Sequence, residues 1–600
     1  MNNKTEEKKD RTMSDKALIK RLYQYTKGYR IRFLVAILLM GLMTCFDLLI
    51  PYLFGYTIKI LGEDVIDFNK IIYLVIIALV IIAISFVVKY FQTMTLNKVG
   101  NEIIFDIRQE TFEKIESLSI GQLNEIPVGK LVTRVGSDVN TLYEMYTNVL
   151  INLLGNIFTI VGVFVAMFIL NAKLTLFVLI ICPVIFGFSV IFRRFSRKAH
   201  REVRKNISNV NAFLSENISG MKVTQVFNQE EKKYQEFKEK NGQLKKSSLK
   251  EIFVFGIFRP SIYVLYVVTV IIVLWLGGNE AIDVNLGIIT VGITYDILFV
   301  FYQYVDKFFN PIQQLAEQFN VLQSSFAAAE RIFEILDSKV NIEDEEDAIE
   351  LEDIKGEIEF KNVWFKYIED EWILKNISFK INANDTVAFV GATGSGKTTI
   401  LSLIVRNYDI QKGQILIDGI DIKHIKIHSL RKNIGQMLQD VFLFSGSIYS
   451  NIQMREESIT LDDVKEASRY VNADKFIEKL PNNYLEEVRE RGNNFSSGQR
   501  QLLSFARTVV HKPKIMILDE ATANIDTETE VLIQDSLEKM MNIGTMLIVA
   551  HRLSTIQHAD KIIVLSKGEI IEEGNHQELL SKKGQYYKLY QLQYHHENNL

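Results

Sequence analysis

One glycine-rich stretch of the sequence has the composition and spacing of a phosphate-binding loop. Residues 391–398 read Gly-Ala-Thr-Gly-Ser-Gly-Lys-Thr, after a strand-like run at 386–390 and before a helix-like run at 400–405. Glycines let backbone amides converge on phosphate oxygens, and the following helix presents its positive end to them. Lys397 would reach the β and γ phosphates, and the Thr398 hydroxyl would bind Mg²⁺. We therefore expect a P-loop that binds ATP and Mg²⁺ through Gly391, Ala392, Thr393, Gly394, Ser395, Gly396, Lys397, Thr398 and Thr399.

Two carboxylates end an apolar run later in the chain, where residues 515–520 read Ile-Met-Ile-Leu-Asp-Glu. A buried strand can hold a carboxylate at its end, toward the Mg²⁺ that accompanies a nucleotide. We expect Asp519 to hold Mg²⁺ through its water shell and Glu520 to polarise the water that attacks the γ-phosphate. Two carboxylates at a strand end are unremarkable alone, so this expectation depends on the P-loop.

Length and composition limit the kind of protein that carries these groups. A chain of 600 residues is too long for one core, because domains usually stop near ~100–200 residues. With 68 basic and 72 acidic residues, the net charge of −4 gives no positive field, so we expect no nucleic-acid partner. The two cysteines, Cys45 and Cys182, lie inside apolar runs and indicate no redox chemistry.

Six apolar segments are long enough to cross a bilayer, which requires a helix of ~20 residues because no water satisfies a bare backbone there. Buried helices of a soluble domain are the alternative, and six segments of this length count against it. The segments lie near residues 31–56, 70–92, 147–170, 172–193, 252–277 and 287–310. We therefore expect an all-α transmembrane domain bound to the lipid bilayer.

The distribution of Lys and Arg predicts the orientation of these spans, since cytosolic flanks keep positive charge. Basic residues crowd after the fourth span, whereas the turn at 277–287 carries two acidic residues and no basic one. Residues 193–251 are therefore expected in the cytosol, together with the polar, Lys-rich first 30 residues, which lack the apolar centre of a signal peptide. The connections at 93–146 and 194–251 have helical apolar spacing, so the spans should continue as helices whose tips, 119–126 and 215–224, could dock on a cytosolic domain.

Three ionisable residues lie inside the predicted spans, and such residues are costly in a membrane and so are functional candidates. They are Asp47, Arg259 and Asp296. Arg259, beside Pro260, could equally snorkel or pair with a carboxylate for purely structural reasons.

The remaining sequence reads as soluble protein. An acidic stretch at 343–353 indicates a linker, and from Gly356 short Val/Ile/Phe runs alternate with helical segments, which is typical of an α/β domain. We expect a cytosolic segment at 1–30, a transmembrane domain at 31–320, a linker at 321–355 and a nucleotide-binding domain at 356–600.

Several further motifs stand in a fixed order around the P-loop. Tyr367 and Gln439 flank it, Phe-Ser-Ser-Gly-Gln occupies 495–499, Ala-Asn-Ile-Asp occupies 523–526, and His551 follows. This order resembles the ATP-binding cassette (ABC) ATPases, in which these motifs look like the adenine-stacking aromatic residue, the Q-loop, the signature, the D-loop and the switch histidine. Residues 487–492 look like the loop by which exporter cassettes sense their membrane helices. Six spans fused ahead of such a cassette are similar to bacterial multidrug exporters over nearly the whole chain.

The resemblance implies roles for these residues. Glu520, His551 and Gln439 would be catalytic, and Thr398, Gln439 and Asp519 would hold Mg²⁺. Two cassettes would pack head to tail, so that Ser496, Ser497, Gly498 and Gln499 serve the ATP of the other subunit.

The signature departs from the family's Leu-Ser-Gly-Gly-Gln, because Phe495 replaces Leu and Ser497 replaces the first Gly. A side chain where backbone approaches phosphate would hinder closure. Together with intact Lys397 and Glu520, this resembles heterodimeric exporters, so we expect a second, different half-transporter as partner, with a homodimer as the alternative.

ATP-driven export or outward flipping of a lipophilic compound across the cytoplasmic membrane is the function that this resemblance implies. A homodimeric lipid flippase, an ATP-gated channel or regulatory subunit, an importer, and a soluble ATPase acting on nucleic acid are the rival functions. Intact Lys397 and Glu520 count against pure regulation, and the six spans count against a soluble ATPase. Aromatic spans, including Phe299 and Tyr302, suit a lipophilic substrate but could equally face lipid.

Overall fold

The computed structural model describes residues 13–285, 293–351, 353–437, 440–454, 456–519, 527–549 and 556–597. The chain divides into two compact units. The first, which we call the helical unit, contains Met1–Glu116 and Val128–Ser338. The second, the cassette unit, contains Lys339–Leu600 and also the short segment Ser117–Pro127. A segment that lies between two membrane helices in sequence therefore folds with the cassette.

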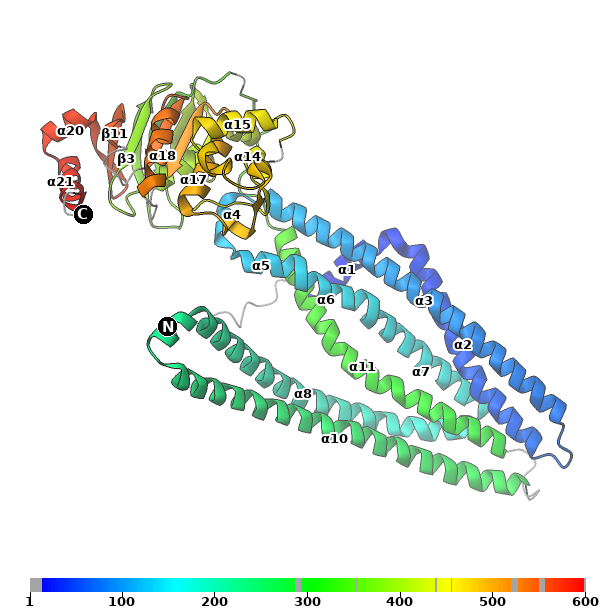
Figure 1. Cartoon of the computed structure of the whole chain (residues 1–600). Helices are drawn as coiled ribbons and strands as arrows, with labels where there is room; N and C mark the ends of the chain where they lie inside the picture. Colours follow the sequence, from blue (N-terminus) through cyan, green and yellow to red (C-terminus); the bar gives the residue numbers. More distant parts are fainter. Residues whose placement is uncertain are drawn as a thin grey trace. The chain divides into compact units, whose positions relative to one another are not determined.

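The helical unit consists of long helices that follow one another in sequence (Figure 1). After the short α1 come α2, α3, α7, α8, α10 and α11, joined by short turns and helical pieces. Their bounds are α1 Asp15–Tyr25, η1 Lys27–Tyr29, α2 Arg30–Leu61, α3 Phe68–Ser117, α5 Val128–Thr133, η2 Arg134–Asp138, α6 Val139–Glu144, η3 Met145–Val149, α7 Leu150–Leu170, α8 Ala172–Ser219, α9 Met221–Val226, α10 Glu230–Asn285 and α11 Tyr295–Leu336.

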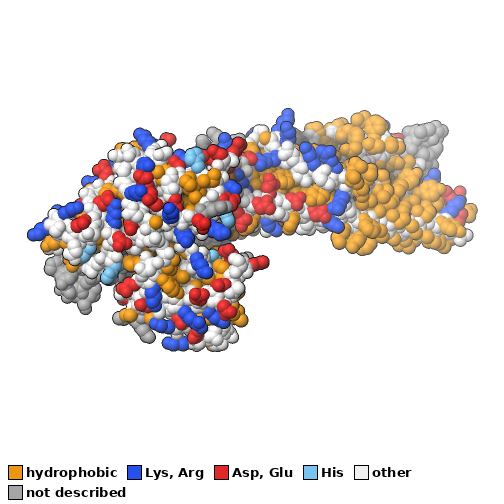
Figure 2. All heavy atoms as spheres, turned by 90° about the horizontal axis from the view of Figure 1, so that it is seen from above, with side chains coloured by type: hydrophobic (Ala, Val, Ile, Leu, Met, Phe, Trp, Pro, Cys, Tyr) orange, Lys and Arg blue, Asp and Glu red, His pale blue; other side chains and the backbone are white. Residues whose placement is uncertain are grey.

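The apolar parts of these helices account for membrane insertion. Within the described residues, four helical stretches are long and apolar enough to cross a bilayer, namely 27–61, 68–117, 128–170 and 230–283, and a shorter apolar stretch at 172–184 begins α8. Figure 2 shows hydrophobic side chains gathered on one part of the helical unit and charged side chains elsewhere on it. The predicted span at 287–310 begins among residues outside the described ones and continues as α11. An all-α transmembrane region thus precedes the α/β domain.

Several helices continue well beyond their apolar parts, as the sequence predicted. α8 and α10 run side by side as a long pair joined through α9 (Figure 1). Asp47 is half-buried on α2 and Asp296 is half-buried in the first turn of α11, whereas the side chain of Arg259 lies outside the described residues. An apolar core that includes Phe301, Val305 and Ile262 packs α11 against α7, α8 and α10.

The helix that leads to α7 is interrupted by two π-helical turns, η2 and η3. Such turns are uncommon and occur frequently at functional sites. Around them a second core packs Leu18 and Leu22 of α1, Ile103 of α3, Leu142 of α6 and Phe333 of α11 together. Tyr146 of η3 also donates a hydrogen bond from its hydroxyl to the Leu22 carbonyl at 2.8 Å.

The cassette unit contains two main sheets. One is mixed and six-stranded, in the order β12-β11-β3-β10-β9-β6, with only β12 antiparallel to its neighbour; the other is antiparallel, in the order β2-β1-β4-β5. A two-stranded ribbon pairs β7 with β8. The strands are β1 Ile358–Phe365, β2 Leu374–Ile381, β3 Thr386–Val390, β4 Lys412–Ile417, β5 Ile420–Asp421, β6 Ile434–Met437, β7 Gly446–Ser447, β8 Glu487–Val488, β9 Ile515–Asp519, β10 Thr545–Val549, β11 Lys561–Ser566 and β12 Glu569–Gly574.

The cassette's helices cover these sheets around two apolar cores. Central strands β3, β9 and β10 are apolar on both faces, as parallel strands covered on both sides must be. The helical elements are α4 Ile120–Glu125, α12 Lys397–Ile404, η4 Ile422–His424, α13 Ile427–Lys432, α14 Ile448–Gln453, α15 Leu461–Tyr470, α16 Asp474–Ile477, η5 Asn483–Leu485, η6 Glu490–Gly492, α17 Ser497–Val510, α18 Thr527–Met540, α20 His576–Lys582 and α21 Gln585–Glu597.

The stretch expected as a linker divides into a helix and a segment that is attached to the cassette through an isolated β-bridge and hydrogen bonds. α11 continues through Leu336, so the beginning of the 321–355 stretch is helical. Farther on, Ile349 forms a parallel bridge with Ile425. His424 lies 2.6 Å from a Glu345 carboxylate oxygen, and the Ile427 amide donates to Asp344 at 2.8 Å. The acidic stretch is therefore bound along the cassette surface.

Candidate ATP-binding site

The glycine-rich loop connects β3 to α12, as its sequence context predicted. Gly391 has φ +156°, and a Cβ there would lie 2.3 Å from the Leu565 carbonyl oxygen. Gly396 has φ +104°, and a Cβ there would lie 2.6 Å from a Leu374 methyl group. Both positions require glycine, because L side chains rarely adopt such backbone angles and no space remains for them. The loop therefore folds tightly and directs the first amides of α12 toward its concave side.

Two polar side chains inside this loop fit a bound phosphate. The Lys397 ammonium donates to the carbonyl oxygens of Gly391 at 2.8 Å and Ala392 at 3.1 Å, so it lies over the loop itself. The Ser395 hydroxyl is buried and has no hydrogen-bond partner among the described residues. A buried unpartnered hydroxyl costs free energy unless a ligand satisfies it. Donors around a Gly-rich turn, the Lys397 ammonium and this hydroxyl suit a nucleoside triphosphate with Mg²⁺.

Tyr367 lies beside the loop, just beyond the end of β1. Its hydroxyl donates to the Thr399 hydroxyl at 3.2 Å, which joins it to the first turn of α12. Partial burial raises the pKa of Tyr367, so the phenol stays neutral and able to donate. The side chain is 46% exposed, which leaves ring surface free for a base to stack on.

The order of the parallel strands brings the P-loop and Asp519 to one edge of the sheet. The P-loop follows β3, and Asp519 ends β9, where it is half-buried. Between them lies β10, which leads toward His551, and β6 beside β9 leads toward Gln439. Carboxyl ends of parallel strands share an edge, which is where α/β folds bind ligands. Gln439, Glu520, His551 and the stretch 523–526 themselves lie outside the described residues.

The signature residues begin another helix, α17, and not the P-loop helix. Ser496 is its N-cap: the hydroxyl accepts from the Gln499 amide at 3.2 Å, while the Gln499 side chain accepts from the Ser496 amide at 3.0 Å. Ser497 is the first helical residue, and it is not among the described residues with a positive φ. α17 packs into one core of the cassette and α12 into the other.

The α4 helix lies against the cassette beside Tyr367, and sequence reasoning missed the residue that it contacts. Tyr408 follows α12, and its hydroxyl accepts a hydrogen bond from the Asn124 side chain at 3.1 Å. A Cβ at Gly121 would lie 2.6 Å from the Tyr408 ring, so α4 approaches closely only because this residue is glycine. The Tyr408 ring stands edge-on to Tyr367, with centroids 5.0 Å apart. The sequence signal that could have identified this contact is the presence of an aromatic residue, Tyr408, shortly after the P-loop helix.

Comparison with known proteins agrees with this geometry. A family model described as the ABC transporter transmembrane region matches residues 33–310, and one described as ABC transporter matches residues 374–523. The chain is 38% identical over 577 residues to the uncharacterized ABC transporter ATP-binding protein YknV of Bacillus subtilis, covering 96% of this chain and 94% of that protein.

Two further relatives carry functional names. The probable multidrug resistance ABC transporter ATP-binding/permease protein YheH of Bacillus subtilis is 39% identical over 513 residues, covering 84% of this chain and 74% of YheH. The ATP-dependent lipid A-core flippase of Desulfotalea psychrophila is 35% identical over 591 residues, covering 97% of this chain and all of the flippase.

The α/β domain therefore couples ATP hydrolysis to transport, and the helices anchor it in the cell membrane with the ATPase on the cytosolic side. The chain belongs to the ABC transporter family, with the transmembrane region and the ATP-binding cassette in one polypeptide.

Proposed function

We propose that this chain is one half of an exporter that uses ATP to move a lipophilic compound outward across, or between the leaflets of, the cytoplasmic membrane. The observation that carries this proposal is the shared sheet edge at which the P-loop, Asp519 and the strands leading to Gln439 and His551 end. That edge belongs to a cassette continuous with an apolar helical unit.

The cassette's residues at that edge have separate roles in binding ATP and in hydrolysing it. Tyr367 stacks on adenine, while residues 391–399 and the Lys397 ammonium hold the phosphates, for which Lys397 must leave the carbonyls of Gly391 and Ala392. Glu520 polarises the attacking water, Gln439 orients that water, and His551 stabilises the developing charge. Mg²⁺ held by Thr398, Gln439 and Asp519 would supply positive charge beside the β and γ phosphates.

Residues 496–499 serve the ATP of the second subunit, because they begin a helix in a different core from the P-loop helix. ATP bound between two subunits favours the closed pair, since only closure completes its contacts. The long helices then transmit closure to the membrane region. Hydrolysis removes the γ-phosphate contacts and so resets the pair.

We propose a heterodimer because of Ser497. Its backbone is helical without a positive φ, so serine causes no backbone strain within this chain. A penalty from its side chain would arise only when a partner's phosphate approaches. This chain's signature would then be the weaker one, and its own P-loop would pair with the signature of another protein.

ATPase activity in lipid tests the assembly. The chain should hydrolyse ATP only with a different, co-purified subunit, and Glu520→Gln should abolish that activity. Ser497→Gly should raise the activity of the chain alone while leaving the complex's Glu520-dependent site intact. Full activity of the unmodified chain alone would replace the heterodimer with a homodimer.

The transported compound is proposed from relatives that are named as a multidrug resistance protein and a lipid A-core flippase. ATP-dependent uptake of a fluorescent lipophilic amine into inverted vesicles against its gradient supports drug export. ATP-dependent transfer of a fluorescent phospholipid between leaflets, without dye uptake, supports a flippase. Dye movement that only follows its gradient would indicate an ATP-gated channel.

A further inference from the structure

A buried carboxylate in the helical unit binds two arginines. Asp138, the last residue of η2, has a side chain that is 6% exposed. Arg134 donates to it from Nη1 at 2.8 Å. Arg331 of α11 donates from Nε to Oδ2 at 3.0 Å and also from Nη2 to Oδ1. A guanidinium from one helix thus forks onto a carboxylate from another.

This fork orients the two helices more than it holds them together. A carboxylate leaves water at a cost that is offset only by good geometry and complete hydrogen bonding. Both conditions are met, and the carboxylate raises the pKa of Arg331. Apolar contacts among Leu142, Phe326 and Ala329 already join α6 to α11. What the ion pair adds to that packing is a fixed register and angle, because a bidentate pair tolerates little sliding.

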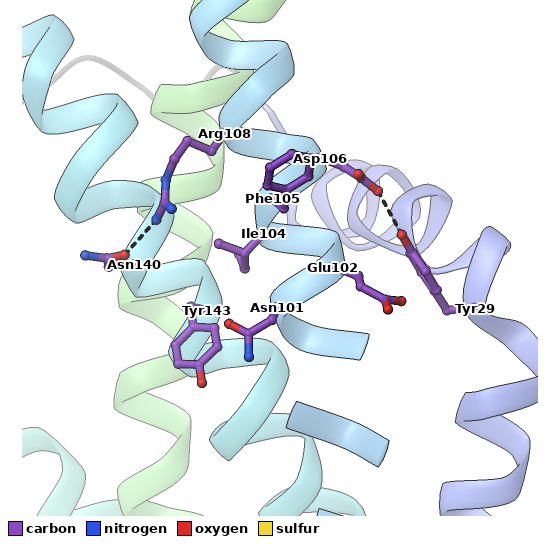
Figure 3. Close-up of a pocket in the computed structure, with 9 residues that line it drawn as sticks. All are labelled: Tyr29, Asn101, Glu102, Ile104, Phe105, Asp106, Arg108, Asn140 and Tyr143. Carbon is purple, nitrogen blue, oxygen red and sulfur yellow. Dashed lines mark hydrogen bonds between the residues drawn. The ribbon is translucent and has the colours of Figure 1, made fainter. Parts of the chain in front are cut away.

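The short helix α6, which follows η2, is also held by a hydrogen bond to α3. A hollow of about 550 Å³ lies between α3, α6 and η1. Figure 3 shows its lining, which includes two hydrogen-bonded pairs of polar side chains. Arg108 of α3 donates to Asn140 of α6 at 3.1 Å, and Tyr29 donates to Asp106 at 3.0 Å. α6 is therefore linked to α3 through Asn140 and adjoins η2, which is linked to α11 through Asp138.

The positions of these links in the chain give them their importance. α11 ends at Leu336, and the chain enters the cassette unit at Lys339. The chain also crosses between the units earlier in the sequence: Ser117–Pro127 belongs to the cassette unit, and η2 follows this segment after the short helix α5. Asp138 and Arg331 therefore connect two helical segments that lie close in sequence to points where the polypeptide crosses from one unit to the other.

We propose that Asp138 is a positioning residue for transport, which makes α11 and the helix after α4 move as one body. If α11 and the helix that contains η2 could move independently, cassette closure would change only the angle between these two helices and would not move the membrane helices. The proposal rests on ATP-driven transport by this chain. Asp138 touches no nucleotide, so it acts only through the two helices.

The first test compares hydrolysis with transport in the complex as it is purified. Asp138→Asn removes the charge at constant shape, and Arg331→Lys keeps a charge but loses the fork. We expect the ATPase activity of Asp138→Asn to stay close to that of the parent. The amount of lipophilic dye taken up per ATP hydrolysed should be about 10-fold lower in this variant, which is within the usual range for energetic coupling between two sites. Dye uptake per ATP in Arg331→Lys should lie between that of the parent and that of Asp138→Asn. Glu236→Gln, which breaks a pair within α10 alone, should change neither quantity.

The second test measures the joint directly and requires no transported compound. Spin labels at the exposed Ser137 and Gln314, with Cys45 and Cys182 replaced by Ser, report the distance between η2 and α11. The parent should give one narrow distribution with and without trapped ATP, and Asp138→Asn should broaden it.

Equal loss of hydrolysis and uptake, or an unchanged distance distribution, would overturn the proposal. If Asp138→Asn does not fold, Arg331→Lys provides both readouts. If the parent moves no dye, the proposal of a lipophilic substrate fails, and the distance measurement alone decides the role of Asp138.

Discussion

The Asn124 side chain donates a hydrogen bond to the Tyr408 hydroxyl at 3.1 Å, which connects α4 to the residue that stands edge-on to Tyr367. α4 comes from the segment between two membrane helices, and Tyr367 lies beside the P-loop. Tyr408 therefore contacts both Tyr367, beside the P-loop, and the segment that lies between two membrane helices in sequence.

Gly121→Ala should displace α4 from Tyr408, because the new Cβ would lie 2.6 Å from the ring. Faster hydrogen exchange of the amides at 119–125 would report this displacement. Transport per ATP should fall more than ATP affinity does. Gly129→Ala in α5 is the matched control, since nothing lies within 4 Å of a Cβ there. Unchanged exchange in Gly121→Ala would show that the backbone adjusts and that close packing at Tyr408 is unimportant.

Tyr367→Ala should weaken ATP binding, because stacking of a base on an aromatic ring contributes roughly 1–3 kcal/mol, or about 5- to 150-fold in affinity. Titration with a fluorescent ATP analogue measures the change. Tyr367→Phe keeps the ring and loses only the hydrogen bond to Thr399, so its affinity should stay close to that of the parent. An equal loss in both variants would assign the effect to the hydroxyl and contradict stacking.

Docking of α21 should weaken as the pH falls below about 6.5. His576 lies 2.7 Å from the Tyr586 hydroxyl, and burial lowers the pKa of His576 from its usual 6.5. The unfolded segment then binds more protons than the folded one, so stability is complete above pH 6.5 and falls as the pH drops toward the folded pKa. Protection factors of the amides at 585–592, which correct hydrogen exchange for its base-catalysed intrinsic rate, measure this difference at pH 7.5 and 5.5.

The control for that prediction is His576→Gln, which cannot titrate in this range. Its protection factors at 585–592 should be the same at these two pH values. If the parent shows no more pH dependence than the variant, protonation of His576 does not control the docking of α21.

Arg507→Lys should destabilise the cassette. The Arg507 guanidinium in α17 donates to the Asn451 carbonyl at 2.8 Å and to the Phe442 carbonyl at 3.1 Å, and lysine cannot reproduce this fork. A loss of about 2 kcal/mol would lower the apparent Tm by roughly 4–8 °C. Thermal unfolding of the full chain in detergent measures it. Lys465→Gln, which breaks an exposed pair, should leave the Tm unchanged.

Much of the fold could be read from the sequence because its signals are local. The P-loop, the apolar helices and the apolar strand ending at Asp519 each depend on residues within one short segment. The expected linker was less predictable. Its first part continues α11, and its acidic part binds the cassette through Glu345 and His424, which lie far apart in sequence.

The sequence by itself determined the chemistry, because glycine spacing, apolar length and strand-end carboxylates are patterns that local physics imposes. Only the tertiary structure decided which distant residues meet. It placed Ser117–Pro127 with the cassette, Asn124 on Tyr408, and Arg331 on Asp138. Such pairs depend on how packed helices bring side chains together, and a buried charge signals that it needs a partner without revealing which residue supplies it.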